Sequence, residues 1–442
     1  MDRSLRAVLL GTFTLRFSTG LTGSMLAFYL AHLADHGGPS VDGFVVGLYA
    51  ATFYLAELVL SPLFGIISDR YGHHRIMVFG PVFGATAVIL TGLAPAFLVF
   101  GAIVMLLILG ATRILEGASS AASVPSILGY IAMATAGDET LRGKTSARFE
   151  AATLAGLGLG AIVGVKLFEF FENLGIGPAA FFLNAAFYGV SFLIYMFGVS
   201  DPPGEAEARA GEHVHVDRYL ALIRSSHVLL LAPTWIAINA ALGVWLSQSV
   251  FQLAKGDDRF PNQVLMGGFT ANQITIGAII IAAIFGAGLL YWGDRFKTYR
   301  RTTIIGYGVM GGAALVVAGL VVNHFATTQP VLAIVAAVVA AGGLFVLAGA
   351  TPAAIGLLAD MSERFPTDRG AIMGLYSVFL AMGQITGSLI GGVAADWLGI
   401  DGMFIATLIL IGIATVPLSR LRAQEHTLTD PGSGGLASEA ST

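Results

Sequence analysis

Long apolar runs alternate with short polar segments along almost the whole chain. Most of these runs contain about the 20 residues that a helix needs to cross a bilayer. They lie at about 7–33, 43–68, 75–94, 97–134, 147–170, 178–199, 226–253, 271–292, 303–322, 330–358, 371–394 and 402–421. The fourth run is too long for a single crossing. The pattern predicts an all-α membrane protein with twelve transmembrane helices.

Composition excludes several other classes of protein. Only 11% of the 442 residues are charged, 56% are hydrophobic, and the mean hydropathy is +0.80. Soluble domains carry roughly 25% charged residues. So few charges cannot cover a water-facing surface, which excludes a soluble enzyme, a disordered protein and a nucleic-acid binder with a basic face. The chain has no cysteine, so disulfides and thiolate metal sites are excluded as well.

The loops differ strongly in basic residues, and this difference sets the expected orientation. Of the 23 Lys and Arg residues, 18 lie in the terminal segments and in the loops on the same side as the termini. The opposite loops hold only Lys255 and Arg259. Because cytoplasmic loops are enriched in basic residues, we expect a multi-pass protein of the cell's inner (plasma) membrane with both termini in the cytoplasm.

A set of prolines, arginines and glycines in the first half recurs 227 residues later. The pairs are Pro125 and Pro352, Gly129 and Gly356, Arg142 and Arg369, Gly143 and Gly370, Gly156 and Gly383, Gly160 and Gly387, and Gly164 and Gly391. The offset is about half the chain, as expected for the duplication of a six-helix unit. An even number of helices per unit gives both halves the same orientation, a parallel repeat known among transporters.

The repeat and the loops predict four regions. Six-helix bundles are expected at 1–199 and 226–422, joined by a cytoplasmic linker at 200–225 whose end has the pattern of a short surface helix. The tail at 423–442 is rich in Gly, Ser and Thr, and we expect it to be disordered.

Two glycine triplets are the expected helix-packing positions. They are Gly156, Gly160 and Gly164 in the first half and Gly383, Gly387 and Gly391 in the second. Spacing of four residues puts each triplet on one face of its helix, where a neighbouring helix can pack closely and rock. Ordinary tight packing without motion is the alternative.

The loop between the second and third spans carries a motif. It begins with Gly65 and continues through Asp69, Arg70 and Gly72 to His73, His74 and Arg75. This segment resembles the signature loop of the major facilitator superfamily, with histidines where that family usually has basic residues. A second copy keeps Asp294 and Arg295. The resemblance implies a fold of two pseudo-symmetric six-helix bundles and a cytoplasmic gate formed by Gly65, Asp69, Arg70, Gly72, Arg75, Asp294 and Arg295.

The physical chemistry of the motif agrees with a gate. A carboxylate at a cytoplasmic helix end can meet the positively charged N-terminus of a neighbouring helix, a contact worth roughly 0.3–2 kcal/mol. Such contacts can hold the cytoplasmic side shut and break when it opens. A plain interfacial turn whose charges set the topology is the alternative.

Four ionisable residues lie inside spans of the first half. Arg16 and Glu57 fall at matched depth, roughly 16–18 Å from the same side, on consecutive helices. Because charges inside a membrane usually face a partner or a cavity, an ion pair facing the central cavity is expected, with Glu57 as the proton switch. Arg113 and Glu116, three residues apart, form a second pair in the proton-coupling and cavity group. Static pairs that only fix helix packing are the alternative.

The second half has no charge in mid-span, so its polar and aromatic residues are the candidate substrate contacts. They are Trp235, Asn239, Gln248, Gln273, Tyr376 and Gln384. Amides and aromatic rings suit a neutral or amphipathic solute. Each residue alone can instead serve as an interhelical hydrogen bond or an interface anchor.

The sequence contains no convincing motif for ATP binding, metal binding or catalysis. Residues 137–145 have the wrong spacing for a phosphate-binding loop, so ATP drive is not expected. His32 and His36 are expected to be interfacial histidines rather than metal ligands. No cofactor, metal site or catalytic residue is predicted, and the chain is not expected to be an enzyme.

The function predicted is secondary active transport by alternating access. We expect a monomer that moves a small-molecule substrate across the lipid bilayer, coupled to protons, with efflux of an amphipathic, drug-like compound preferred. Proton-coupled uptake of a sugar or metabolite is the first alternative. A receptor or lipid-handling protein that kept the fold and lost coupling is the second.

Overall fold

The computed structural model describes residues 2–135, 138–200, 230–362 and 369–429. Within these ranges every regular element is a helix, as the apolar runs predict. The chain forms two compact units. The first comprises the helices of the N-terminal half together with residues 247–256 and 268–278, and the second holds the rest of the C-terminal half.

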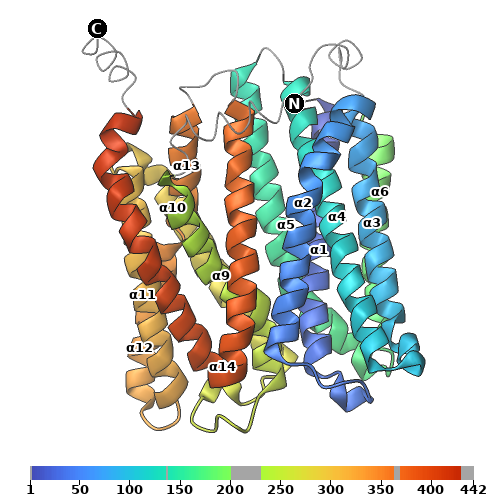
Figure 1. Ribbon diagram of the computed structural model, residues 1–442, viewed down its shortest axis with the longest axis vertical. Coiled ribbons are helices and arrows are strands. Elements are labelled where there is room, and N and C mark those ends of the chain that lie inside the picture. The colour runs from blue at the N-terminus through green and yellow to red at the C-terminus, as the bar shows by residue number, and fades with distance from the viewer. Residues whose placement is uncertain (1, 136–137, 201–229, 363–368, 430–442) are drawn as a thin grey trace. The chain divides into compact units, whose positions relative to one another are not determined.

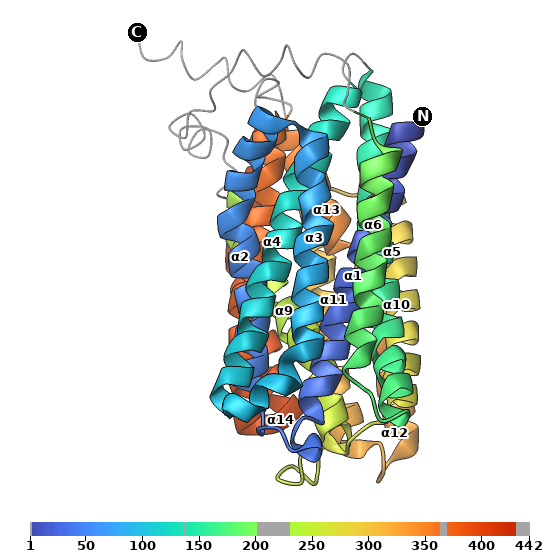
Figure 2. The same cartoon turned by 90° about the vertical axis from the view of Figure 1, so that its right-hand side faces the viewer.

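Six long helices build the N-terminal half, and they run side by side in Figure 2. They are α1 Arg3–Ala31, α2 Gly43–Tyr71, α3 His73–Leu93, α4 Ala102–Ala134, α5 Glu139–Asn173 and α6 Ala179–Gly198. The short 3-10 helices η1 Ala34–His36 and η2 Ala94–Phe100 lie in two of the connections. The overlong fourth run therefore resolves into η2, a turn at Gly101 and α4.

The C-terminal half repeats this order with two interruptions. Its helices are α9 Ala232–Lys255, α10 Ala271–Gly293, α11 Arg301–Phe325, α12 Pro330–Leu347, α13 Ala350–Ser362 and α14 Arg369–Thr429, with η4 Val264–Met266 and η5 Asp294–Lys297 between them. The tenth run is split into α12 and α13. The last two runs form α14, which turns back on itself at Gly399, where φ is 64° (Figure 1).

The number of crossings agrees with the sequence pattern. Ten helices of the described part are long and apolar enough to span a membrane. That set counts α14 once although it has two legs, and it leaves out α1, whose middle carries Arg16 among Ser, Thr and Gly. Large apolar side chains such as Leu107 and Val338 are 67% and 68% exposed on the helix surfaces. Such surfaces are suited to lipid.

Two predictions for the connecting regions have different outcomes. In the region of the predicted disordered tail, α14 continues as a helix to Thr429. A helix can extend beyond the apolar run when its next residues, here an Ala-Gln-Glu-His segment, have adequate helix propensity. The linker at 200–225 lies outside the described residues except for Ser200, as do residues 430–442.

Polar residues define the starts of several helices. The Asp42 carboxylate accepts a hydrogen bond from the Val45 backbone N–H at 2.9 Å at the start of α2. At the start of α10, the Gln273 side chain accepts from the Thr270 N–H at 2.9 Å, and the Thr270 hydroxyl faces the Gln273 N–H at 3.4 Å. This reciprocal pair is a capping box. Gln273 is exposed, so the structure places this substrate candidate in a helix cap.

The first glycine triplet brings the backbones of α5 and α1 into direct contact, as its spacing predicts. A β-carbon added at Gly160 would strike the Phe17 carbonyl oxygen of α1. One added at Gly164 would lie 2.8 Å from the Leu21 carbonyl oxygen, and Gly156 also faces the α1 backbone. All three glycines therefore lie on the face of α5 that packs against α1.

The second triplet makes the equivalent contact between α14 and α9. A β-carbon added at Gly387 would strike the Ala240 carbonyl oxygen of α9, and one at Gly391 would lie 2.9 Å from the Val244 Cα. Gly383 faces the α9 backbone in the same way. The repeat therefore builds two equivalent glycine seams, α1–α5 and α9–α14.

The seam can be tested at one position with a matched control two residues away. We expect Gly160→Ala to destabilise the protein by about 1–3 kcal/mol, the usual cost of overpacking. Gly158→Ala, on the same helix with open space around it, should leave stability unchanged or raise it by up to about 1 kcal/mol. Thermal unfolding of both purified variants in detergent measures the difference. Equal stabilities would show that the seam tolerates a methyl group.

Candidate functional site

A chain of hydrogen bonds joins Arg16 and Glu57 in the middle of the N-terminal half. Arg16 Nη1 donates to the Ser120 hydroxyl at 2.9 Å, and that hydroxyl donates to Glu57 Oε1 at 2.6 Å. Arg16 is 8% exposed, and Glu57 is the central residue of α2. The site therefore draws one residue from each of α1, α2 and α4.

The direct ion pair predicted between Arg16 and Glu57 is replaced by a bridged one. Ser120 stands between the two charges, so the hydroxyl transmits the interaction and fixes both side chains. Sequence reasoning missed Ser120. The spacing in the sequence could have predicted its position. Arg113, Glu116 and Ser120 are spaced i, i+3 and i+7 on α4, so Ser120 lies on the same helix face as the two charged residues.

The second predicted pair is present and more deeply buried. Arg113 Nη1 contacts the Glu116 carboxylate, and the two residues are 5% and 1% exposed. The Tyr188 hydroxyl of α6 donates to Glu116 Oε1 at 3.2 Å. Arg113 Nε and Nη2 have no hydrogen-bond partner among the described residues. Nothing in the sequence pattern pointed to Tyr188, because its contact depends on how α6 packs.

Close packing of α4 on α2 holds the two pairs in place. A β-carbon added at Gly117 would strike the Phe53 carbonyl oxygen and lie 3.2 Å from the Glu57 backbone nitrogen. This near-contact of backbones places the polar face of α4 beside the middle of α2. Ser120, Arg113 and Glu116 of α4 thus lie beside α2, and α4 contributes to both sets of contacts.

The glycine seams reveal which residue of the second unit corresponds to Arg16. An added β-carbon at Gly156 would lie 2.9 Å from Arg16 Cβ, and one at the repeated position, Gly383, would lie 2.5 Å from Asn239 Cβ. Asn239 therefore occupies in the second unit the place that Arg16 occupies in the first. The position that holds the charged Arg16 side chain in the first unit therefore holds the neutral amide of Asn239 in the second.

Three of the predicted substrate contacts lie together in the second unit. The Asn239 side chain donates to the Trp235 carbonyl at 2.9 Å, and the Gln384 side chain donates to the Asn239 carbonyl at 3.4 Å. Gln384 Oε1 is buried with no partner among the described residues.

Besides Gln273 in its helix cap, two candidates remain. Gln248 belongs to the first unit, where its side chain donates to the Gly43 carbonyl at 3.0 Å. It therefore satisfies a buried backbone group. Tyr376 lies on α14 in the leg before Gly399, and its side chain lies outside the described ones.

The motif loop folds as its glycine requires. Gly72 ends α2 with φ at 105°, a backbone conformation that favours glycine. The Asp69 carboxylate is exposed and lies 3.7 Å from His73 Nε2. Arg70 stacks over the Tyr71 ring, with its guanidinium carbon 5.5 Å from the ring centre. Gly65 packs beside Pro125, and Arg75 is exposed.

The two histidines of the motif loop have structural contacts. His73 is buried, with Nδ1 3.2 Å from the Ser68 hydroxyl, and His74 donates from Nε2 to the Tyr195 carbonyl at 2.9 Å. The His73 ring also fills the space where a side chain at Gly129 would stand. These contacts explain why histidine is accommodated where the resemblance leads one to expect other basic residues.

The second copy of the motif has the same local pattern. Arg295 follows Asp294 at the start of η5 and stacks over the Tyr291 ring at 4.6 Å. A β-carbon at Gly356 would lie 3.0 Å from Arg301 Nε, as one at Gly129 would meet His73. The structure thus extends the repeat to contacts between side chains.

Comparison with known proteins identifies relatives that cover most of the chain. A sequence model described as the Major Facilitator Superfamily matches residues 8–290 and 260–438. Multidrug resistance protein 2 of Bacillus subtilis (strain 168) is 24% identical over 362 residues, 80% of this chain and 81% of that protein. Quinolone resistance protein NorA of Staphylococcus aureus (strain MSSA476) is 22% identical over 399 residues, 90% of this chain and 91% of that protein.

Solved structures share the fold at low identity. The crystal structure of nucleoside transporter NupG aligns with a TM-score of 0.66 and 15% identity over 96% of this chain and 99% of that one. The D-xylose-proton symporter aligns with a TM-score of 0.65 and 14% identity over 93% and 96%. At this identity the likeness shows the fold, which is all-helical as predicted.

Proposed function

Because this chain belongs to the major facilitator superfamily, whose members are membrane transporters rather than enzymes, we propose that it exports an amphipathic solute in exchange for protons. The solute leaves the cell by alternating access, and protons move inward. The observation that carries this proposal is the Arg16–Ser120–Glu57 chain of hydrogen bonds in the middle of the membrane-spanning helices.

The chemistry of that chain suits proton coupling. A carboxyl group can bind or release a proton, and the charged form of such a group is disfavoured where water is excluded from around it. Opening and closing of the pathway changes the hydration of this cluster, so the carboxyl group can take up a proton in one state and release it in the other. Protonation then favours one conformation, which couples the proton gradient to the movement of the solute.

Two observations support an amphipathic substrate and export. Trp235, Asn239 and Gln384 offer an aromatic ring and amides without a fixed charge, and this suits a solute with apolar and polar parts. The relatives by sequence are named for multidrug and quinolone resistance. Export of a foreign amphipathic compound is the function that these names and this chemistry share.

A second candidate is proton-coupled uptake of a polar metabolite. The amides Asn239 and Gln384 are also suited to hydroxyl groups, and one structure of similar fold is a D-xylose-proton symporter. A non-transporting receptor on the same fold is the remaining alternative. These functions differ in ligand class and in the direction of solute movement relative to the proton gradient.

The orientation and the gate complete the proposal. The predominance of basic residues on one side supports cytoplasmic termini in the inner membrane. The loops that carry Asp69 and Asp294 would then face the cytoplasm and act as the gate. The ends at which α1 joins α2, α3 joins α4 and α5 joins α6 would face outward.

The experiment has two steps. Thermal stabilisation of the purified protein is first measured with drugs, sugars, peptides and lipids, and we expect amphipathic drugs to stabilise it. Proteoliposomes with an imposed pH gradient then measure flux of each stabilising compound, and we expect exchange against protons. Movement of a sugar in the same direction as protons would support uptake instead. Absence of flux for every stabilising compound under any gradient would contradict coupled transport.

A further inference from the structure

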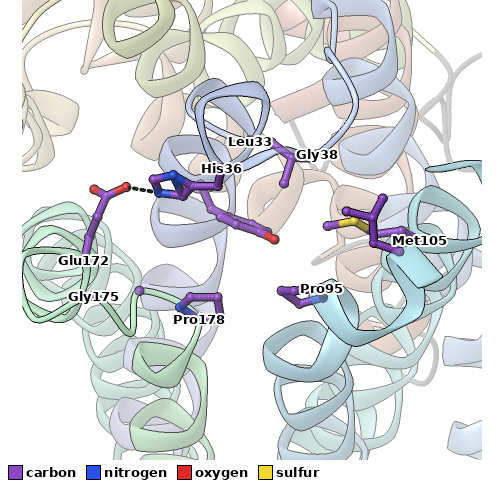
Figure 3. Close-up of a pocket in the computed structure, with 11 residues that line it drawn as sticks. Leu33, His36, Gly38, Pro95, Met105, Glu172, Gly175 and Pro178 are labelled. Atoms are coloured by element: carbon purple, nitrogen blue, oxygen red, sulfur yellow. Dashed lines mark hydrogen bonds and ion pairs between the residues drawn. The ribbon is translucent and has the colours of Figure 1, made fainter. Parts of the chain in front are cut away.

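A pocket of about 400 Å³ lies inside the first unit, at the end opposite the motif loop. It is formed by the end of α1 with η1, by η2, by the start of α4, and by the connection from α5 to α6. Figure 3 shows Glu172 and His36 together on one side and Met105 on the opposite side. Ligand pockets have volumes of roughly 300–1,000 Å³, so this one suits a small ligand.

The pocket is separate from the charged cluster used for transport. Tyr29, which lines it, lies 13 residues beyond Arg16 on the same helix α1. At 1.5 Å per residue this is about 20 Å along the helix axis. A ligand here would therefore occupy a second site, and the inference does not depend on the proposed transport function.

Its walls are apolar and firmly packed. Leu33 and Met105 are 2% and 1% exposed, and Leu98 of η2 completes the apolar lining. The Tyr29 ring packs against Phe168 and Phe181, with ring centres 5.5 Å and 6.2 Å apart. These neighbours fix the ring, so the position of the Tyr29 hydroxyl is set in advance of binding.

Two polar groups of the pocket have unused hydrogen-bonding capacity. The Tyr29 hydroxyl makes no hydrogen bond with any residue in the described part of the chain, although Tyr29 is only 2% exposed. Glu172 accepts one hydrogen bond from His36 Nε2 at 2.8 Å through Oε1, and its side chain is 22% exposed. A ligand in the pocket can therefore form a hydrogen bond with each of these two groups.

We propose that this pocket binds a small amphipathic amine. The ammonium group pairs with the Glu172 carboxylate, and an acceptor such as a carbonyl oxygen takes the hydrogen bond of Tyr29. The apolar body of the ligand lies against Leu33, Leu98 and Met105. A cation is favoured over an anion because the carboxylate is the charged acceptor of the pocket, and a hydrogen bond between charged groups is stronger than a neutral one.

Binding of a matched pair of probes tests the proposal. Procaine is a 4-aminobenzoate ester with a tertiary ammonium group, whereas benzocaine is an ester of the same acid without the tertiary amine; the aromatic amine that both share is uncharged. Titration into the full-length protein in nanodiscs should give binding for procaine and at least about tenfold weaker binding for benzocaine, because one charged contact is lost. Equal affinities of the two probes would overturn the proposal.

Variants assign the contact to named residues. Glu172→Gln should weaken procaine binding about tenfold or more, and Tyr29→Phe about fivefold, in line with the loss of one charged and one neutral hydrogen bond. Glu169→Gln removes a charge from the same helix one turn away, where the carboxylate pairs with Lys166, and should leave the affinity unchanged. Unchanged affinity in Glu172→Gln would overturn the proposal.

The absence of native cysteine allows the bound ligand to be located. Leu98→Cys places a thiol in the pocket, and procaine should slow its reaction with N-ethylmaleimide. Ser40→Cys places a thiol on the exposed loop at the same end, and its reaction should not change. Equal rates for Leu98→Cys with and without procaine would place the ligand elsewhere and overturn the proposal.

The amine can belong to a dissolved compound or to a lipid headgroup. Nanodiscs of phosphatidylethanolamine and of phosphatidylglycerol distinguish these sources, because only the first lipid has an amine. Weaker procaine binding in phosphatidylethanolamine would assign the pocket to a lipid amine, and equal binding would assign it to a solute.

Discussion

Replacing Arg113 by methionine is expected to destabilise the protein by about 3–5 kcal/mol, because it leaves the buried Glu116 carboxylate without its positively charged partner. Both side chains are almost fully buried. Removing one member of such a pair therefore costs more than the pair contributes when it is intact. Denaturant unfolding of the purified variant in detergent measures the loss.

A second substitution distinguishes the effect of the unpaired buried charge from the effect of the changed side-chain shape at position 113. The double variant Arg113→Met with Glu116→Gln has no buried charge at this place and keeps an oxygen acceptor for Tyr188, so it should recover much of the lost stability. Arg6→Met, at an exposed position of α1, should change stability by no more than about 0.5 kcal/mol. A double variant as unstable as the single one would show that the ion pair is not the cause.

Glu57→Gln should abolish transport driven by a pH gradient while the protein remains folded. The amide can still accept the hydrogen bond from the Ser120 hydroxyl, but it cannot exchange a proton. Flux in proteoliposomes should become independent of the imposed gradient, and unfolding in detergent should stay close to that of the unaltered protein. Full coupling in this variant would remove Glu57 from the proton pathway.

Two further variants refine that test. Ser120→Ala keeps both charges and removes only the hydroxyl between them, so coupling should weaken without being lost. Asp35→Asn makes the same change of charge at an exposed position beyond the end of α1 and should retain coupling. A loss in Asp35→Asn equal to that in Glu57→Gln would indicate a general effect of charge.

The sequence predicted the fold more completely than the site. Hydropathy located the long helices of the described residues, most of them to within a few residues, because each apolar run must match the thickness of a bilayer; α5 and α14 extend about eight residues beyond their runs. The glycine spacing predicted two tightly packed faces, since three successive turns without side chains permit little else. The break of the tenth run near Gly349 and the helical residues after Arg422 depend on local backbone preferences that hydropathy does not contain.

Residue type and depth in the membrane did not predict which side chains of the site contact one another. Depth alone placed Arg16 and Glu57 together, but the bridging Ser120 comes from a third helix, and its hydroxyl is one of many along α4. Gln248 and Gln273 have the same residue type as Gln384, yet one donates to the carbonyl of the first residue of α2 and the other caps a helix. Whether such an amide bonds to backbone or keeps an unpartnered oxygen, as Gln384 does among the described residues, depends on tertiary packing.

The glycine seams have a consequence for motion. Along α1–α5 and α9–α14 the glycines bring the two helix backbones into close contact, so few side chains interdigitate at these lines. Shear between packed helices is ordinarily limited to displacements that existing rotamers can absorb. Where no rotamer has to change, one helix can shift along the other by a fraction of a turn at low cost. Each half therefore contains one glycine seam along which two helices can slide past each other while the other helix contacts of that half stay packed.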